Sequence, residues 1–437
     1  MKQLFTILTF TFLFSIAKAQ LPNPALIGYW HNWNDANAPY ISLDAIDNRY
    51  NVIAVAFAVP VSPSDMTMLF TPDVITTSVF KSKVQALQNK GKKVLLSIGG
   101  ANASIDLTST ANKNAFISSI SSLVNTYGFD GIDIDIENGN SILITGGSMA
   151  APTNVAQINL IEAIKQIMVN YRTSHSNKLL LSITPETAYV QGGQSAFGSI
   201  WGGYLPIISA LRDSLDMVQV QLYNSGTMYG IDNKIYAQGT ADFIIAMTEA
   251  VIHGFSTSGG SFVGLPASKV VVGLPACNLA AGGGYVNPDT LFAAVNYLTG
   301  VGIQPGSYKL SNTNGYKTLR GLMTWSINWD AVSTCATSNQ FAANFERIYG
   351  KSSFIKNAES STLFSVFPNP THGNITLSLN SENTLITITD VLGREVLKTI
   401  ASEKQLNLNL KNNGVYTICI KTEQGIAIKK ILVNQQN

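Results

Sequence analysis

Short apolar runs alternate with longer amphipathic segments through roughly the first three quarters of this chain. Eight runs are rich in Ile, Val and Leu, as buried strands are, and they cover residues 26–30, 52–59, 93–100, 131–137, 179–186, 217–224, 270–276 and 321–328. Between them, apolar residues recur at three- and four-residue spacing, which predicts helices over residues 78–89, 111–127, 154–171, 240–253 and 288–298.

This order of elements predicts an α/β fold. Strands that alternate with helices form parallel sheets, and eight repeats in about 325 residues favour a closed (β/α)8 TIM barrel. The alternative is a doubly wound open sheet, but no Gly-rich phosphate loop follows the first run.

The pattern changes after residue 350. Residues 351–363 are rich in Ser, Lys, Asn and Glu and predict a linker. Beyond it, alternating runs separated by Gly- and Asn-rich turns cover residues 374–379, 384–390, 406–410, 415–420 and 426–433. We therefore expect a barrel domain over residues 20–350 and a small all-β sandwich domain over residues 364–437.

The N-terminus has the pattern of a secretory signal peptide. One basic residue precedes an apolar run over residues 4–16, and Ala17-Lys18-Ala19 follows, the small-x-small pattern of a cleavage site. The run is short of the roughly 20 residues that span a bilayer. We expect residues 1–19 to be a signal peptide cleaved after Ala19, and the mature chain to be extracellular without a membrane span.

Charge is scarce along the chain. Only 12% of its residues are charged, against about 25% in an average domain. The formal net charge is +2 and Lys and Arg form no cluster, which argues against nucleic acid as a partner. A surface built from neutral polar and aromatic side chains suits neutral ligands such as sugars.

The cysteines and histidines are few. Cys277 and Cys335 each follow a predicted strand of the barrel and could form a disulfide bond or stay as buried free thiols. Cys419 lies in an alternating run and reads as a core thiol. The four histidines show no metal-ligand spacing, so we expect neither a metal site nor a cofactor.

The most informative segment is the fourth run. Successive side chains of a strand point to opposite faces, so Asp133, Asp135 and Glu137 share one face while the intervening isoleucines cover the other. In a barrel, the isoleucines would pack under the helices and the acids would form a column rising to the C-terminal rim, where catalysis takes place in this fold. Asp130 falls outside this alternation, and we interpret it as structural.

Three stacked carboxylates cannot all ionise cheaply. We expect the column to hold at least one proton, with a raised pKa for one member. Glu137, at the rim, is then a candidate general acid. The structural alternative, buried acids paired with Lys or Arg, lacks an inward-facing basic residue on the other predicted strands.

These acids belong to a pattern that resembles family 18 of the glycoside hydrolases, whose DxxDxDxE signature is present at residues 130–137. Other predicted strands agree, with SIGG at 97–100, QLYN at 221–224 and GLMTWSINWD at 321–330. The resemblance spans residues 25–350 and is strongest to the bacterial chitinase D-like group. It implies a chitinase that hydrolyses β-1,4 bonds between N-acetylglucosamine units of chitin or chitooligosaccharides.

The resemblance also implies a retaining, substrate-assisted mechanism, in which the acetamido group of the sugar replaces the second carboxylate of the usual pair. Glu137 would be the general acid/base. Asp135 would orient the acetamido N–H, and Asp133 would share a proton with Asp135. Tyr223 would donate its hydroxyl to the acetamido oxygen.

Substrate contacts follow from the same resemblance, which places them at Tyr29, Phe57, Gly100, Gln221, Asn224 and Trp325. Trp325 would form the floor under the sugar, because flat rings stack on sugar C–H faces. Other aromatic residues in or near rim loops could bind sugar or belong to the core, and these are Trp30, Trp33, Trp201, Tyr204, Tyr285 and Trp329. Glu186, at the end of the fifth run, is expected at the rim.

Two alternatives share this motif. An endo-β-N-acetylglucosaminidase acting on N-glycan cores would use the same column, and fold and motif alone do not set the substrate. A non-catalytic chitin-binding lectin would be expected to lack the terminal glutamate, which is intact here.

The tail resembles the C-terminal sorting domain of the type IX secretion system of the Bacteroidetes. The motifs are FPNP at 367–370, GNI at 373–375, DVLGRE at 390–395, GVY at 414–416 and KKILV at 429–433. The resemblance implies an address label read by the secretion machinery, and the alternative is a carbohydrate-binding or spacer module. We expect the protein to be a monomer.

Overall fold

The computed structural model describes residues 21–350, 364–391, 394–422 and 425–435. The expected signal peptide, its cleavage site after Ala19 and the expected linker over residues 351–363 lie outside the described residues. The chain divides into two compact units, Met1–Lys351 and Ser352–Asn437.

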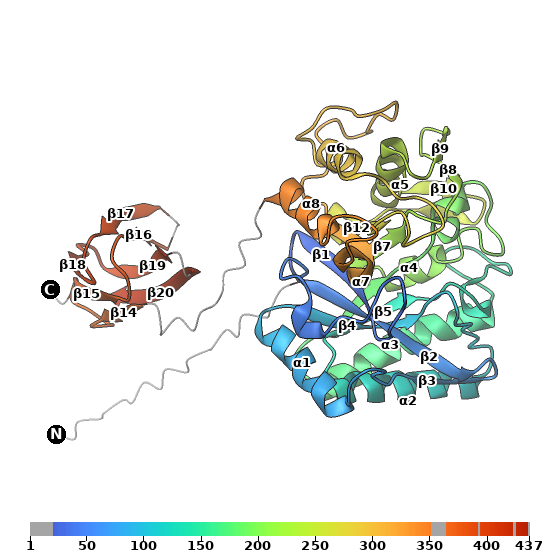
Figure 1. Cartoon of the computed structure of the whole chain (residues 1–437), viewed down its shortest axis with the longest axis horizontal. Helices are drawn as coiled ribbons and strands as arrows, with labels where there is room; N and C mark the ends of the chain where they lie inside the picture. The colour runs from blue at the N-terminus through green and yellow to red at the C-terminus, as the bar shows by residue number, and fades with distance from the viewer. Residues whose placement is uncertain (1–20, 351–363, 392–393, 423–424, 436–437) are drawn as a thin grey trace, which may run out of the picture. The chain divides into compact units, whose positions relative to one another are not determined.

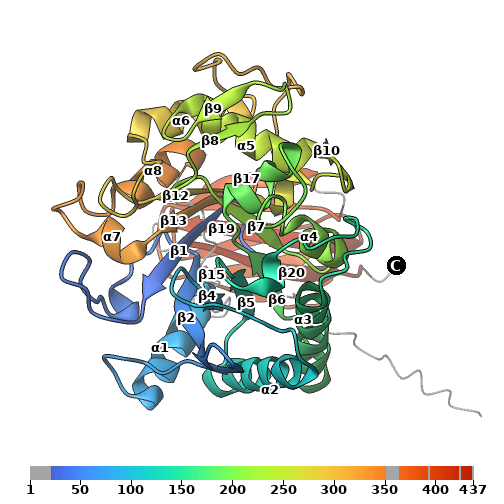
Figure 2. The same cartoon turned by 90° about the vertical axis from the view of Figure 1, so that its right-hand side faces the viewer.

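The first unit is built on a closed barrel (Figures 1 and 2). Its eight parallel strands are β1 (Ala25–His31), β2 (Val52–Ser62), β4 (Lys93–Gly99), β5 (Gly131–Asp135), β6 (Leu180–Ile183), β7 (Met217–Gln221), β12 (Val270–Pro275) and β13 (Gly321–Trp325). Each pairs with its neighbour, and β1 pairs with both β2 and β13, so the sheet has no free edge within the ring. The expected TIM barrel is confirmed.

Helices surround the strands, as Figure 2 shows. They are α1 (Thr77–Asn89), α2 (Thr110–Tyr127), α3 (Val155–Ser174), α4 (Leu205–Leu211), α5 (Ala241–His253), α6 (Pro288–Leu298), α7 (Ile327–Ala331) and α8 (Gln340–Tyr349). Side chains cap six of their N-termini, which satisfies backbone N–H groups that a helix leaves free; the capping residues are Thr76, Ser109, Asn154, Thr240, Asn287 and Ser326.

Some predicted strands extend further toward the C-terminal rim of the barrel than the strands of the structure do. The run expected over residues 321–328 ends as a strand at Trp325, because the Ser326 hydroxyl accepts from the Trp329 N–H and starts α7. The run expected over residues 131–137 likewise ends at Asp135. The second overrun leaves Glu137 beyond the regular strand.

The barrel domain also contains short strands and 3₁₀ helices that the sequence did not predict. The added strands form hairpins: β3 (Asp65–Leu69) pairs with β2, β8 (Thr227–Tyr229) with β9 (Ile235–Ala237), and β10 (Phe255–Thr257) with β11 (Gly260–Phe262). Short 3₁₀ helices cover Leu43–Ala45, Asn140–Ile142, Thr187–Tyr189, Gln191–Gln194 and Ala267–Lys269. Such elements are too short to show a hydrophobic period.

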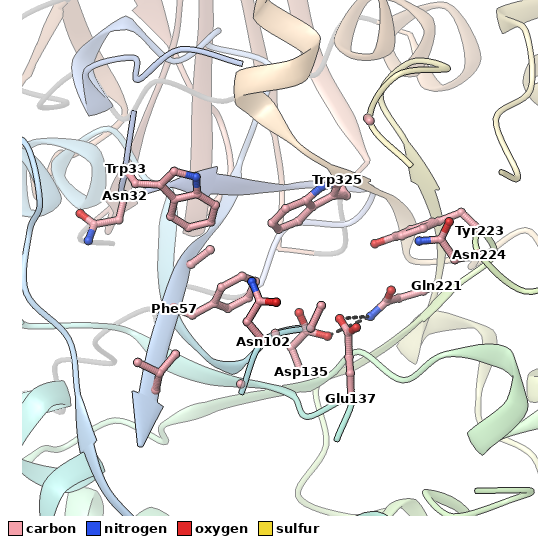
Figure 3. Close-up of a pocket in the computed structure, with 16 residues that line it drawn as sticks. Asn32, Trp33, Phe57, Asn102, Asp135, Glu137, Gln221, Tyr223, Asn224 and Trp325 are labelled. Atoms are coloured by element: carbon pink, nitrogen blue, oxygen red, sulfur yellow. Dashed lines mark hydrogen bonds between the residues drawn. The ribbon is translucent and has the colours of Figure 1, made fainter. Parts of the chain in front are cut away.

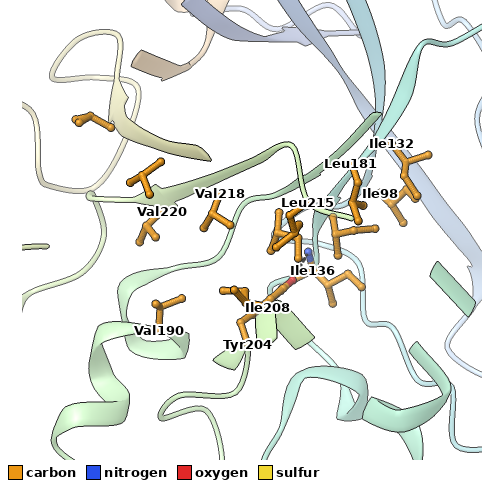
Figure 4. Close-up of a cluster of buried hydrophobic side chains, with 14 of the residues drawn as sticks. Ile98, Ile132, Ile136, Leu181, Val190, Tyr204, Ile208, Leu215, Val218 and Val220 are labelled. Atoms are coloured by element: carbon orange, nitrogen blue, oxygen red, sulfur yellow. Dashed lines mark hydrogen bonds between the residues drawn. The ribbon is translucent and has the colours of Figure 1, made fainter. Parts of the chain in front are cut away.

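Two apolar regions enclose the polar column. Outward-facing side chains of the strands pack under the helices, and Figure 4 shows part of this core, including Ile98, Ile132, Leu181 and Val218. Inside the barrel, a second cluster fills the N-terminal end, with members such as Ile27, Ala54, Leu95, Met217, Val271 and Met323. Packed side chains therefore close the N-terminal end of the interior, which leaves the C-terminal end for a site.

The second unit consists of two antiparallel sheets. One has the order β14 (Phe364–Phe367), β15 (Asn374–Leu379) and β18 (Gln405–Asn409); the other has β17 (Glu395–Ala401), β16 (Thr384–Thr389), β19 (Gly414–Thr422) and β20 (Gly425–Val433). Apolar side chains from both sheets share one core, among them Leu377, Ile386, Ile418 and Ile431. Strands β14 and β17 were not expected.

Cys277 and Cys335 form a disulfide bond across a sequence separation of 58 residues. It ties the segment after β12 to the segment between α7 and α8. Cys419 is a free, half-buried thiol on β19. Among the described residues, no helix has both the length and the apolar character needed to cross a membrane.

Candidate active site

The column of acids stands inside the barrel as the alternation predicts. Asp133 and Asp135 are buried on β5, and Glu137, two residues beyond Asp135, is partly exposed. The three isoleucines between and before them pack outward in the main core. The acids thus run from the middle of the barrel to its open end.

Asp133 is held by uncharged donors on β1, β4 and β7, and on β6 and the residue that follows it. It accepts hydrogen bonds from Tyr29 (2.6 Å), Ser97 (2.7 Å), Ser182 (2.6 Å), Thr184 (2.7 Å) and Gln219 (3.2 Å). These five donors satisfy both oxygens of the Asp133 carboxyl group without a cation. Within the described part of the chain, no Lys or Arg forms an ion pair with this or the two higher acids.

Asp135 and Glu137 are joined by one amide. Gln221 Nε2 donates to Asp135 Oδ1 at 2.9 Å and to Glu137 Oε1 at 3.2 Å (Figure 3). Burial, together with the charges of Glu137 and Asp133, raises the pKa of Asp135 well above its usual range. Burial also raises the pKa of Glu137, against the Gln221 hydrogen bond, which lowers it. Near its open end, the column therefore holds a proton up to a higher pH than a free carboxyl would.

Glu186 adds a fourth carboxyl at this end, as the sequence predicts. It follows β6, and its backbone bridges to Gln221 in parallel register. Burial, and then the charge of Glu137, raises the pKa of Glu186 to about 7. Asp130 lies outside the column, where its Oδ2 accepts from the Val94 N–H at 2.9 Å and its Oδ1 pairs with Lys93 at 3.2 Å, which fits a structural role.

A pocket of about 430 Å³ opens above the column. Most of the expected sugar-contacting residues line it, together with both upper acids: Phe57, Gly100, Asp135, Glu137, Gln221, Tyr223, Asn224 and Trp325. Asn32, Trp33, Ala56, Val59, Gly99, Ala101, Asn102 and Ala280 also line it and were not assigned to this site beforehand, apart from Trp33 among the loop aromatics. Tyr29 and Asp133 lie outside this lining, and the Tyr29 ring contacts Trp325 at 5.6 Å between centroids.

Aromatic rings form one wall of the pocket. The Phe57 and Trp325 rings lie 5.8 Å apart and nearly parallel, with 10° between their planes. Gly100 has a φ of +78°, and a Cβ there would approach the Phe57 ring to 2.7 Å, so this position admits only glycine without a shift. In Figure 3, Asp135 and Glu137 face this wall across the pocket.

His31 supports that wall and was missed in the sequence. Its ring stacks on Trp33 at 4.6 Å and contacts Trp325 at 4.8 Å. Burial lowers the pKa of His31 to about 4, so the ring is neutral at physiological pH and acts as an aromatic spacer. Its place on the inward face of β1, two residues after Tyr29, is the signal that could have found it.

A loop after β12 supports the opposite side. Asn224 N–H donates to Gly283 O at 3.1 Å, and Asn224 Oδ1 accepts from Gly282 N–H at 2.9 Å. A Cβ at Gly284 would come within 2.5 Å of Tyr223 Cα, so this loop lies directly against the tyrosine backbone. The disulfide at Cys277 anchors the start of this loop.

The remaining aromatic candidates divide between core and surface. Trp30 is fully buried beside Tyr40 and Phe80, on the outward face of β1, and Tyr204 is fully buried as well. Trp201 is 38% exposed, and neither it nor Tyr285 nor Trp329 lines the pocket. The buried pair belongs to the core because both rings face the helices rather than the interior of the barrel.

Comparison with known proteins gives the family. Residues 25–332 match the model of the glycosyl hydrolases family 18, and residues 365–434 match the secretion system C-terminal sorting domain. The chain is 44% identical over 323 residues to Chitinase Chi52 of Paenibacillus xylanexedens, covering 73% of this chain and 60% of that protein. It is 45% identical over 323 residues to Chitinase D of Niallia circulans, covering 72% and 60%.

Among solved structures, a family GH18 chitinase from Chromobacterium violaceum is 35% identical, with a TM-score of 0.65. The match covers 74% of this chain and 83% of that one. The chain spans 60% of the length of the two curated relatives named above. On the extent of the family match, this chain belongs to family 18 of the glycosyl hydrolases and carries a C-terminal secretion sorting domain.

Proposed function

We propose that this protein is a secreted chitinase that hydrolyses β-1,4 bonds between N-acetylglucosamine units with retention of configuration. The observation that carries the proposal is the pair of carboxyls, Asp135 and Glu137, which Gln221 joins by hydrogen bonds and which face an aromatic wall across the pocket. The names of the relatives, Chitinase Chi52 and Chitinase D, support chitin as the substrate.

In this mechanism Glu137 protonates the glycosidic oxygen as the bond to the anomeric carbon breaks. The carbonyl oxygen of the 2-acetamido group attacks the same carbon and forms an oxazolinium ion. The Glu137 carboxylate then takes a proton from a water molecule whose oxygen attacks the anomeric carbon. The bond from that carbon to the acetamido oxygen breaks, the acetamido group is regenerated, and the configuration is retained. The raised pKa of Glu137 supports its role as the proton donor.

The other residues would orient the reacting acetamido group. Asp135 would turn from Gln221 to accept a hydrogen bond from the acetamido N–H, and Tyr223 would donate its hydroxyl to the acetamido oxygen. Burial raises the pKa of Tyr223, so its hydroxyl keeps the proton that it would donate. Asp133 would share a proton with Asp135 during this turn. Trp325 and Phe57 would stack on the sugar.

The test is product analysis by mass spectrometry. The full chain is incubated with chitin oligomers and, separately, with a high-mannose glycopeptide. Cleavage of the oligomers alone is expected, while cleavage of the glycopeptide alone would indicate an endo-β-N-acetylglucosaminidase. Binding without cleavage of either would indicate a lectin.

The matched variant is Glu137→Gln. It keeps the size of the side chain but cannot cycle a proton, so turnover is expected to fall about 10²- to 10⁴-fold while oligomer binding persists. A near-normal rate would remove Glu137 from the acid role.

Export is part of the proposal. The sorting domain supports delivery by the type IX secretion machinery to the cell surface or medium. Deleting residues 364–437 in a host with that machinery should retain the chain inside the cell envelope, which fractionation and immunoblotting would detect. Normal appearance of the truncated chain in the medium would contradict this route.

A further inference from the structure

The backbone that carries Glu137 leaves the sheet before it reaches the pocket. The last ladder bond between β5 and β6 runs from the Thr184 N–H to Ile134 O at 2.9 Å. On the other side, the Gly100 N–H donates to Asp135 O at 2.6 Å. Ile136 and Glu137 therefore continue past the regular pairing, although Ile136 is buried, where unpaired peptide groups are costly.

Tyr204 supplies the partners that β6 does not. Its hydroxyl accepts from the Ile136 N–H at 3.0 Å and donates to Ile136 O at 2.7 Å. The backbone N–H and C=O of Ile136 are thus both satisfied by one fully buried side chain. Figure 4 shows the Tyr204 hydroxyl reaching Ile136 from the outer core.

Tyr189 holds the next carbonyl group. Its hydroxyl donates to Glu137 O at 2.9 Å. The two tyrosines form one unit, because the Tyr204 N–H donates to Tyr189 O at 2.9 Å and their rings meet edge to face with centroids 5.9 Å apart.

The segment that carries both tyrosines follows β6 and is docked on the segment after β5. Ser199 and Ile144 exchange two backbone hydrogen bonds of 2.8 Å, and the Gln157 amide on α3 donates to Gly203 O at 2.8 Å. A Cβ at Gly203 would come within 2.0 Å of Ile142 O, so the two segments are in close contact. Hydrogen bonds to the segment after β5 and to α3 therefore hold the segment that carries both tyrosines in place.

We infer that Tyr204 and Tyr189 are positioning residues, which fix the backbone of residues 136 and 137 and thereby the place of the Glu137 carboxyl above the column. The inference rests on the proposed function, in which Glu137 gives and takes the proton. A general acid must stand within hydrogen-bond reach of the leaving oxygen, and a displacement of about 1 Å can cost 10²-fold in rate. Neither tyrosine lines the pocket, so substrate affinity does not depend on them directly.

The experiment compares Tyr204→Phe with Tyr308→Phe in the full chain. Tyr308 is the matched control, because it is equally buried and its hydroxyl donates to the buried Glu249 of α5 at 2.6 Å. For Tyr204→Phe, kcat on chitin oligomers is expected to fall about 10- to 100-fold while KM stays within about twofold. Tyr308→Phe should leave both values near those of the wild type, even where it lowers Tm. An equal loss of kcat in the two variants would overturn the inference.

A second measurement does not depend on turnover. Hydrogen exchange of the amides in residues 131–138 should quicken about 10-fold or more at Ile136 in Tyr204→Phe, and stay unchanged in Tyr308→Phe. Unchanged exchange at Ile136 would overturn the inference whatever the activity. A wild-type chain that cleaves no substrate would instead contradict the proposed function, and exchange would still decide the role of the tyrosines.

Tyr189→Phe provides an independent variant. It removes one hydrogen bond, to Glu137 O, and leaves the Ile136 peptide group bonded to Tyr204. A smaller fall in kcat than for Tyr204→Phe, again with KM unchanged, is expected. If Tyr204→Phe fails to fold, a kcat for Tyr189→Phe equal to that of the wild type would refute the inference.

Discussion

Gln221 Nε2 lies 2.9 Å from Asp135 Oδ1 and donates a hydrogen bond to it. Although it is uncharged, the Gln221 amide links Asp135 and Glu137, two acids whose pKa values are raised by burial. It also reaches Glu137 at 3.2 Å, and its hydrogen bonds favour the charged form of each carboxyl. Gln221 therefore moderates the rise in pKa that burial imposes on the pair.

Replacing Gln221 by Met should move the pH profile. Met has a similar length but no donor, so the pKa of the Asp135–Glu137 pair should rise further. The alkaline limb of kcat/KM, where Glu137 loses its proton, should then shift to higher pH, as steady-state kinetics on a chitin oligomer would show. Gln191→Met is the control, because Gln191 is buried and donates to Met247 O instead. A limb that stays in place, or moves to lower pH, would contradict the assignment.

Asp133→Asn should destabilise the barrel. The carboxylate accepts five hydrogen bonds, whereas an amide presents one acceptor oxygen and turns its NH₂ toward donors. The free energy of unfolding in urea should fall by about 1–3 kcal/mol, and turnover should fall with it. Asp130→Asn, which changes a partly exposed acid outside the column, should cost less and leave kcat near the wild-type value. If both variants lowered the free energy of unfolding by the same amount, the five donors to Asp133 would stabilise the barrel no more than the contacts of Asp130 do.

Glu186 should make stability depend on pH. Its pKa rises from 4.5 to about 7 on folding, so between these values the folded state binds more protons than the unfolded state. Stability from this group is therefore lost as pH rises from about 4.5 to 7. Calorimetry across this window should show a smaller fall in Tm for Glu186→Gln than for the wild type. Glu162→Gln on the exposed face of α3 is the control, and equal slopes for both variants would disprove the effect.

The Cys277–Cys335 disulfide should stabilise the side of the pocket that carries Tyr223 and Asn224. Converting both cysteines to Ser should lower the free energy of unfolding by about 2–4 kcal/mol and raise KM, because the loop after Cys277 lies against Tyr223. Thermal unfolding and kinetics on chitin oligomers would measure both effects. Cys419→Ser changes the free thiol of the second unit and should alter neither KM nor the barrel transition. An unchanged KM in the double variant would show that the loop holds its place without the bond.

Patterns within single segments predicted the fold and the column. The eightfold alternation of strands and helices follows from the hydrophobic period, and the common face of Asp133, Asp135 and Glu137 follows from the two-residue repeat of a strand. Both are local properties. The same reasoning placed Asp130 outside the column, where it bonds to Val94 and Lys93.

Local patterns could not show which residues from other strands meet the column. The hydroxyls of Ser182 and Thr184 carry no signal in the sequence, yet they bond to Asp133 across 49 and 51 residues of chain. For Trp30 and Tyr204 the sequence left both sugar binding and core packing open, and the structure places both in the outer core. For the same reason, the sequence did not decide whether Cys277 and Cys335 form a disulfide bond, because the two residues are 58 positions apart.

The sequence by itself determined that the chain is a barrel with three acids on one face, because strand and helix periods are written in consecutive residues. The tertiary structure decided how those acids are held: Asp133 by five neutral donors, Asp135 and Glu137 by one amide, and the backbone of Ile136 and Glu137 by two tyrosines. The bonds to the three acids depend on barrel closure, and those to the backbone of Ile136 and Glu137 depend on the docking of the segment after β6. Such contacts join distant residues, and no local period records them.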